Sequence, residues 1–259
     1  MKIRFGLILA AFAVLASGCA TVRQTPVALT KNSVDAQAGR IGVVMTALPK
    51  VDTYLPGAGC LLCLAVASGM NSKLTAHAAT LSYEELPNLK NEVASLLRKN
   101  GAAVTVIEEE LDLKALPDAA TKGINLAGKD FSSLQRKHQI DRLLVINVNM
   151  IGFERTYSGY IPTSDPKSLF EGLGYIVNLK TNTYDWYQPV RVLKSADQAW
   201  DEPPKFPGLT NAYFQSLEMG KDQFLQPFAA GVKAAAPAVA QVPAQPLPTA
   251  AAPTPKTIQ

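Results

Sequence analysis

The segment of residues 142–150 constrains the fold more than any other part of the chain. Apolar side chains recur there at every second position, which is the spacing of a β-strand with one buried face: Leu144, Ile146, Val148 and Met150. The opposite face starts apolar and turns polar at Asn147 and Asn149. The pattern therefore predicts a strand that is covered along one whole face.

Strand and helix patterns alternate along the first half of the chain, and a hairpin follows in the second half. Further strand patterns occur at residues 40–48, 103–107, 175–180 and 186–193. Helical spacing of apolar residues occurs within 57–79 and at 86–97, 130–138 and 210–228. This order predicts an α/β (α+β) fold, a single domain with a mixed β-sheet of about five strands and helices packed on it.

The first 19 residues have the layout of a bacterial signal sequence. Lys2 and Arg4 form a charged start, residues 5–15 are apolar, and three small residues precede Cys19. The apolar run is too short for a membrane-spanning helix and is typical of a cleaved signal peptide. The ending, Leu15 to Cys19, resembles the bacterial lipobox. That resemblance implies that Cys19 becomes the acylated N-terminus, and two or more acyl chains hold a protein stably at a membrane.

The predicted anchor divides the chain into four parts. Residues 1–18 are the signal peptide, 19–38 the lipidated N-terminus and flexible tether, 39–230 the α/β domain, and 231–259 an Ala/Pro-rich tail. The tail buries too little apolar surface to fold, so it is expected to be disordered. Ala20 follows the cysteine, where Asp would resemble the inner-membrane retention signal. The expected location is the outer membrane, with the domain facing the periplasm or the cell surface.

The charge of the folded part argues against nucleic acid as a partner. Four of the 25 basic residues, Lys2, Arg4, Lys233 and Lys256, lie in the predicted signal peptide and tail. The rest of the chain then holds as many basic residues as acidic ones. Such a body lacks the positive surface that binds a phosphate backbone.

Two phrases of the domain resemble a group of envelope proteins. They are the strand phrase IDRLLVI at residues 140–146 and the hairpin phrase VNLKTNTYDW at residues 177–186. With the order of elements over residues 40–228, they resemble the α/β domain shared by the amino-terminal part of the translocation protein TolB, the curli-export lipoprotein and lipoprotein activators of penicillin-binding proteins. The resemblance implies a non-enzymatic binding or assembly role, and it transfers no functional residue.

Cys60 and Cys63 form a C-x-x-C pair. In an oxidising periplasm such a pair can form a disulfide, and at a helix N-terminus the pKa of one thiol can fall. The two intervening leucines and the lack of cationic neighbours favour a structural disulfide or two buried thiols over redox chemistry. His77 and His138 are poorly placed in the sequence to complete a zinc site, and no catalytic motif is present. No metal, cofactor or enzymatic activity is therefore expected.

Two segments are candidates for binding other molecules. Aromatic residues concentrate over 157–214, and the proposed partner-binding set is Tyr157, Tyr160, Trp186, Trp200 and Phe206. The segment 200–207 contains three prolines and is predicted to be an exposed, stiff loop. The segment 57–70 is rich in Gly, Ala and Leu but too short to span a membrane. It favours a buried core helix or a contact between copies of the chain.

The sequence as a whole predicts a lipid-anchored, non-enzymatic envelope component that binds an envelope protein, with a homo-oligomer as a further expectation. Two alternatives remain. One is binding of peptidoglycan or another glycan, aided by the Pro/Ala tail. The other is a thiol–disulfide function at Cys60 and Cys63.

Overall fold

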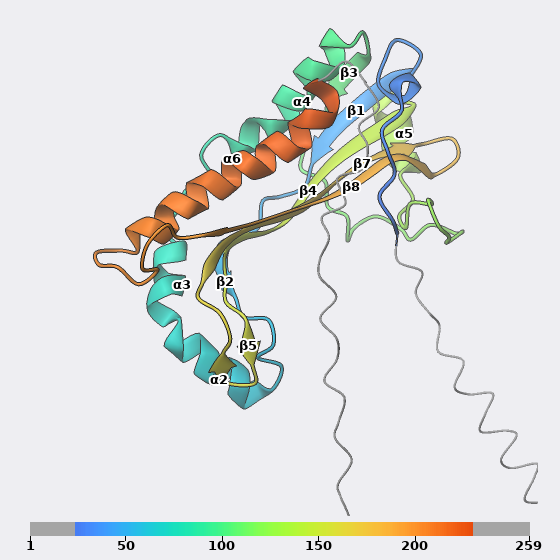
Figure 1. Cartoon of the computed structure of the whole chain (residues 1–259). Helices are drawn as coiled ribbons and strands as arrows, with labels where there is room; N and C mark the ends of the chain where they lie inside the picture. The colour runs from blue at the N-terminus through green and yellow to red at the C-terminus, as the bar shows by residue number, and fades with distance from the viewer. Residues whose placement is uncertain (1–23, 230–259) are drawn as a thin grey trace, which may run out of the picture.

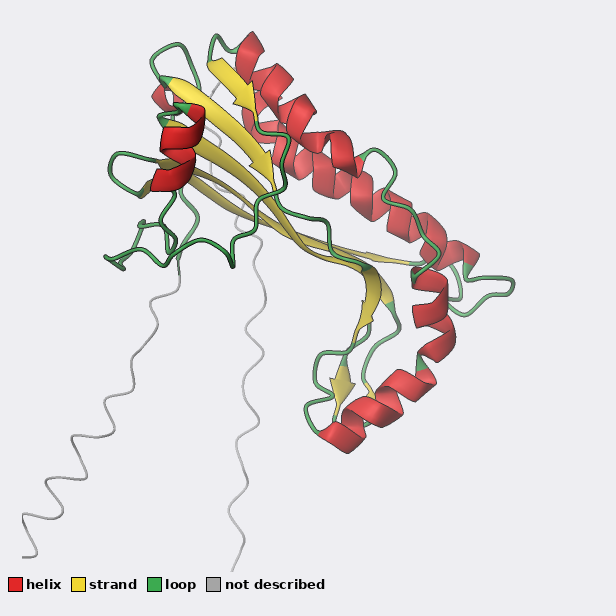
Figure 2. Ribbon diagram, turned by 180° about the vertical axis from the view of Figure 1, so that it is seen from behind, coloured by secondary structure: helices red, strands yellow, loops and turns green. Residues whose placement is uncertain are grey.

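The computed structural model describes residues 24–229 of the chain. The predictions for the signal peptide, for Cys19 and for the tail at 231–259 fall outside these residues. Over the described residues, a twisted sheet carries two long helices on one face, and a narrow arm extends from one end of the sheet (Figures 1 and 2).

The sheet has six strands in the order β3-β1-β4-β7-β8, with β2 beside the far end of β4. Their bounds are β1 Arg40–Met45, β2 Val51–Tyr54, β3 Ala103–Val106, β4 Arg142–Glu154, β7 Lys167–Asn178 and β8 Thr183–Ser195. β1 runs parallel to β3 and β4, whereas β4, β7 and β8 pair antiparallel. The prediction of a mixed sheet of about five strands with helices packed on it is confirmed.

Strand β4 connects the body of the molecule to the arm. Its 13 residues would span about 43 Å at ~3.3 Å per residue. β1 lies beside its residues 142–146, and β2 lies beside its residues 151–154. A register shift between Val148 and Met150 separates the two parts. The shift adds one residue to the alternation of buried and exposed side chains, so Ile151 follows Val148 on the buried face. Met150, which the sequence pattern places on that face, is half-buried instead.

Helices α4 (Leu89–Lys99) and α6 (Pro207–Ala229) cover one face of the sheet and enclose the main core. α4 follows a 3-10 turn, η3 (Leu86–Asn88), and ends before Gly101, whose φ of +91° suits a left-handed residue after a helix. On the opposite face, a smaller core forms around Phe131 and Tyr175. Residues of the segment 107–131 and of α5 (Ser132–His138) complete it.

Residues 24–38 differ from the flexible tether predicted for 19–38. Val27 exchanges two backbone hydrogen bonds with Tyr187 of β8, at 2.9 and 3.1 Å. After a short 3-10 turn, η2 (Lys31–Ser33), Val34 and Ala38 are fully buried in the main core. Two isolated buried residues produce no periodic pattern, so the sequence gives no sign of this packing.

The arm is a small structure with a core of its own. It contains β2, the far ends of β4 and β7, helices α2 (Leu61–Met70) and α3 (Ser72–Ala78), and a ribbon of β5 (Tyr157–Ser158) and β6 (Ile161–Pro162). The N–H of Tyr157 donates to the carbonyl of Pro56 at 2.8 Å, and that of Gly159 to the carbonyl of Gly57 at 3.2 Å. Gly57 has a φ of +89°, and a Cβ there would lie 1.8 Å from the carbonyl oxygen of Tyr157, so this contact requires glycine.

Helix α2 is not the buried core helix that the sequence favours for residues 57–70. Only Cys63 and Ala67 of α2 are buried, and they pack with Ala58 and Tyr157 in a cluster separate from the main core. The other side chains of α2 are exposed. This helix therefore has its apolar surface open to the surroundings.

Candidate functional site

A hollow of about 680 Å³ lies where α3 faces the loop that connects β8 to α6. Lys73, Ala76 and His77 line it from α3, and Trp200, Glu202 and Phe206 line it from the loop. The two sides come from segments far apart in the sequence. They meet because α3 at the base of the arm lies next to the beginning of α6.

Trp200 and Phe206 form the apolar wall of this hollow. Their rings are nearly parallel, with a 3° angle between planes and 6.1 Å between centroids. The guanidinium carbon of Arg155 lies 5.0 Å from the centroid of the Trp200 ring, within the range of a cation–π contact. Both aromatic side chains are half-buried and pack against the main core. The loop is exposed at residues 201–205, whereas its two aromatic side chains are fixed to the body.

His77 links α3 to the first turn of α6. Its Nε2 lies 2.7 Å from Oγ1 of Thr210, and its ring centroid lies 5.5 Å from that of Phe206. Partial burial, followed by the positive charge of Lys205, lowers the pKa of His77 below its ordinary value of 6.5. The neutral imidazole is therefore the form that fits the folded hollow best.

We expect the protein to lose stability as the pH falls below about 6.5. In that range the unfolded chain binds a proton at His77 that the folded chain does not yet bind, so the free energy of unfolding decreases as pH decreases. Urea unfolding between about pH 8 and 5.5 measures this dependence. The His77→Gln variant should show a flatter profile. An identical profile in the variant would show that other groups cause the loss.

Two of the five aromatic residues predicted to bind a partner lie in the interior. Tyr157 is 5% exposed, and its hydroxyl accepts a hydrogen bond from Nδ2 of Asn71 at 2.6 Å. Trp186 is 2% exposed and packs edge-on against Phe228, with 5.2 Å between ring centroids. Neither side chain reaches the surface, so their prediction as binding residues is corrected. Aromatic composition alone does not distinguish a core residue from a surface residue.

Tyr160 lies on a different surface from the hollow. It is exposed at the tip of the arm, beside Ile161. The structure therefore brings Trp200 and Phe206 together and leaves Tyr160 apart from them. The α3 side of the hollow could not be predicted from the sequence. Its only local signal is that Leu74 and Ala78 are four residues apart and buried, so the positions between them face away from the core.

Cys60 and Cys63 form a disulfide at the first turn of α2. Cys60 is the N-cap of the helix and is exposed, whereas Cys63 is buried in the core of the arm. No Lys, Arg or His occurs in residues 53–72, so the local sequence provides no cation to stabilise a thiolate. The bond joins the cap to the third helical residue and thereby fixes the start of α2.

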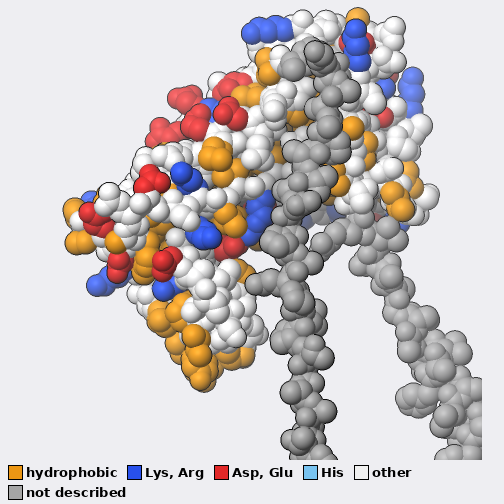
Figure 3. All heavy atoms as spheres, in the orientation of Figure 1, with side chains coloured by type: hydrophobic (Ala, Val, Ile, Leu, Met, Phe, Trp, Pro, Cys, Tyr) orange, Lys and Arg blue, Asp and Glu red, His pale blue; other side chains and the backbone are white. Residues whose placement is uncertain are grey.

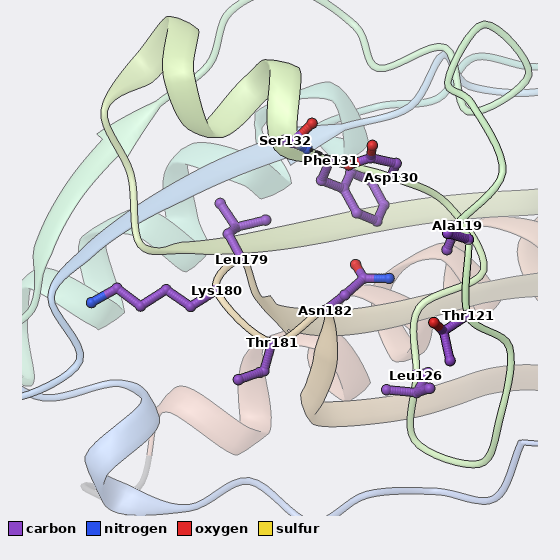
Figure 4. Close-up of a pocket in the computed structure, with 11 residues that line it drawn as sticks. Ala119, Thr121, Leu126, Asp130, Phe131, Ser132, Leu179, Lys180, Thr181 and Asn182 are labelled. Atoms are coloured by element: carbon purple, nitrogen blue, oxygen red, sulfur yellow. Dashed lines mark hydrogen bonds between the residues drawn. The ribbon is translucent and has the colours of Figure 1, made fainter.

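A second hollow, of about 380 Å³, lies beside the turn between β7 and β8 (Figure 4). Two of its polar residues, Asp130 and Asn182, already have partners. Asp130 accepts a hydrogen bond from the N–H of Ser132 at 2.8 Å, and Asn182 exchanges two hydrogen bonds with the backbone of Ala127. Lys180 points away from the other labelled residues in Figure 4. The labelled side chains provide no cluster of charges that could hold an ion or a charged ligand.

Within residues 24–229, no helix is both long enough and apolar enough to cross a bilayer. The same residues contain no group of three or more His, Cys, Asp or Glu side chains placed to share a metal ion. Of the two hollows, the one beside α3 is the larger, and it carries the aromatic wall of Trp200 and Phe206.

No protein-family model matches the sequence, and a search of curated proteins finds no relative. Among solved structures, PelC from Paraburkholderia phytofirmans, a dodecamer, is 12% identical over 80% of this chain and 97% of its own, with a TM-score of 0.30. The protein XCC0632 from Xanthomonas campestris is 14% identical over 79% of this chain and 89% of its own, with a TM-score of 0.37. Lipoprotein GNA1162 from Neisseria meningitidis is 12% identical over 70% of this chain and 96% of its own, with a TM-score of 0.22. Likenesses of this size define neither a shared family nor a shared function.

Proposed function

We propose that this chain is a non-enzymatic component of the bacterial cell envelope, anchored at the outer membrane by an acylated Cys19. We propose further that it binds a protein partner in the hollow between α3 and the loop at 199–206. The observation that carries the proposal is the hollow itself, in which the wall of Trp200 and Phe206 faces the exposed surface of α3.

The composition of the hollow matches that of a protein-binding surface. Protein interfaces combine an apolar, aromatic centre with a polar rim, and tryptophan is enriched among the residues that dominate affinity. Here the aromatic wall is bordered by exposed charges of both signs: Lys73, Asp201, Glu202 and Lys205. The stacking of the wall also fixes its shape in advance, which lowers the entropy lost when a partner binds.

The contacts of His77 hold the two sides of the hollow together. The Thr210 hydroxyl beside it also lies 3.0 Å from the carbonyl oxygen of Phe206 and 3.3 Å from that of Lys205. This hydroxyl therefore links α3, the loop and α6.

Photo-crosslinking in living cells tests the proposal. Ala76 is exposed on α3 and lines the hollow, so a photoreactive residue at this position should give one adduct of defined mass. The Trp200→Ala change removes one of the two rings of the wall and should reduce the adduct yield at least about tenfold, as expected for a residue at the centre of an interface. The intact mass of the same purified protein reports whether Cys19 carries acyl chains.

The matched control places the photoreactive residue at Ser95, which is exposed on α4 and does not line the hollow. We expect no adduct there. Because Trp200 also packs against the body, Glu202→Lys serves as a second variant that changes only the rim. An equal adduct at both positions, or none at Ala76, would count against partner binding here. An adduct that cell-wall digestion removes would favour the glycan alternative.

A further inference from the structure

The tip of the arm carries the most exposed apolar side chains of the described residues. Leu61 is 91% exposed and Leu62 is 72% exposed, and both are at the start of α2. Leu64, Val66 and Met70 extend this surface along the helix, and Tyr160 and Ile161 extend it onto the β5–β6 ribbon. Figure 3 shows hydrophobic side chains (orange) gathered at the lower end of the arm. We refer to these seven residues as the arm tip.

The arm tip lies in two segments without charge. Residues 53–72 contain no Asp, Glu, Lys or Arg, and neither do residues 156–164. α2 is apolar around its whole circumference, and such helices are normally covered by protein or by lipid. Over the described residues only Cys63 and Ala67 of this helix are covered.

The composition of the arm tip favours lipid over a protein partner. Protein interfaces are enriched in aromatic residues and Arg and form about one hydrogen bond per 100–200 Å², whereas leucine is uncommon among their dominant residues. Apart from Tyr160, the tip is aliphatic or thioether. From Leu64 onward the backbone N–H groups of α2 are bonded within the helix, which lowers the cost of placing it in hydrocarbon.

The arm holds α2 in place before any membrane contact. Asn71, which is buried between α2 and α3, donates to the carbonyl of Ala67 at 2.7 Å and to the hydroxyl of Tyr157 at 2.6 Å. The Cys60–Cys63 disulfide fixes the first turn. Insertion therefore requires no folding step at the membrane.

The length of α2 determines how it can meet a bilayer. Its ten residues extend about 15 Å at ~1.5 Å per residue, whereas a hydrocarbon core is about 30 Å thick. The helix cannot cross the bilayer. It can lie in one surface, as short interfacial helices do.

The proposed anchor meets the body beside β8, where Val27 pairs with Tyr187. Cys19 precedes Gln24, the first described residue, by five positions, and five residues span at most about 18 Å. In Figure 1 the first described residues (dark blue) lie on the right beside the strands of the body, and the arm extends to the lower left. The role of the arm tip as a second membrane contact rests on the proposed function, since it assumes an acylated Cys19.

We propose that the arm tip inserts into the hydrocarbon of a lipid surface and provides a second membrane contact beside the acyl chains. Insertion is driven by aliphatic burial, so it does not require anionic lipid. With both contacts made, the body is held in one orientation at the membrane, instead of hanging from a single flexible anchor.

Vesicle flotation with the unacylated mature chain, residues 20–259, tests the proposal without the anchor. This chain keeps all described residues. We expect it to float with phosphatidylcholine vesicles, and we expect addition of about one fifth anionic lipid to change binding by less than about threefold. The double change Leu61→Ser and Leu62→Ser should weaken binding about 100-fold, at about tenfold for each leucine removed from hydrocarbon.

The matched control is the double change Ile124→Ser and Met219→Ser, which removes two exposed apolar side chains far from the tip. It should leave binding unchanged. Met70→Ser is an independent tip variant and should weaken binding several-fold. All variants are expected to unfold at the wild-type temperature, since the altered side chains are exposed.

Three results would overturn the proposal. The first is that the wild-type chain does not bind vesicles, and the second is that the tip and control variants lose binding equally. The third is that the chain forms a soluble oligomer that does not float, and that the Leu61→Ser/Leu62→Ser change dissociates this oligomer. The third would show that the tip is a contact between copies of the chain. Crosslinking at Ala76 does not depend on flotation, so failure of the tip proposal and failure of the partner proposal can be told apart.

Discussion

The Gly152→Val variant is expected to lose between about 2 and 6 kcal/mol of unfolding free energy. Gly152 lies in β4 opposite Asp52 of β2, with a φ of +139°, and a Cβ there would lie 1.9 Å from the carbonyl oxygen of Asp52. A side chain at this position adds the strain of a disfavoured backbone conformation to a steric clash with the paired strand. β2 must then separate from β4, and the arm loses its attachment on that edge.

Urea unfolding measures the loss, and limited proteolysis locates it, because cleavage should begin within residues 51–72. The control is Gly69→Ala, which lies in the same arm on α2, where an added Cβ would meet nothing within 4 Å. We expect this variant to be unchanged or more stable by up to about 1 kcal/mol, since alanine favours helix over glycine. Equal behaviour of the two glycine variants would refute the steric explanation.

The Phe170→Ala variant is expected to lose about 3–5 kcal/mol, the range for truncating a large buried aromatic residue. Phe170 is fully buried on β7 and lies edge-on to Phe224 of α6, with 6.1 Å between ring centroids. A Cβ at Gly220 would lie 2.4 Å from its ring, so α6 approaches the sheet closely at this point. Removal of the ring leaves a cavity that the helix and the sheet cannot close without moving.

The comparison for this prediction is Met219→Ala, on the same helix but exposed. Its effect should be within about 0.5 kcal/mol, as for most surface substitutions. Thermal and urea unfolding of both variants provide the measurement. A loss below about 1.5 kcal/mol for Phe170→Ala would mean that the interface between α6 and the sheet is less tightly packed than the structure shows.

The strands and helices of the body could be predicted because their patterns are local. The pattern at 142–150 predicted the first part of β4, and the pattern at 210–228 predicted nearly all of α6. β7 was predicted only from residue 175, although it begins at Lys167. Gly172 and Gly174 weaken the strand signal, and in the structure both lie where an aromatic ring leaves no room for a side chain. A Cβ at Gly174 would lie 2.5 Å from Trp186, and one at Gly172 would lie 3.0 Å from Phe224.

The candidate site was only half predictable. The loop with Trp200 and Phe206 was expected to take part in binding, because its prolines and aromatic residues are a local feature. His77 and Ala76 could not be connected with it, since their approach depends on how α3 packs beside α6. Tyr157 and Trp186 were assigned wrongly for the same reason, because burial is a property of the whole fold.

The sequence by itself determined the order of the elements in the body and the absence of charge from residues 53–72 and 156–164. Both are properties of the chain that no packing can alter. Only the tertiary structure decided that α2 is exposed at the end of an arm. A short, wholly apolar helix has the same pattern in a core as on a surface, so its environment is set by distant contacts. Here those contacts are made at Gly57, Asn71 and Gly152, which hold α2 away from the main core.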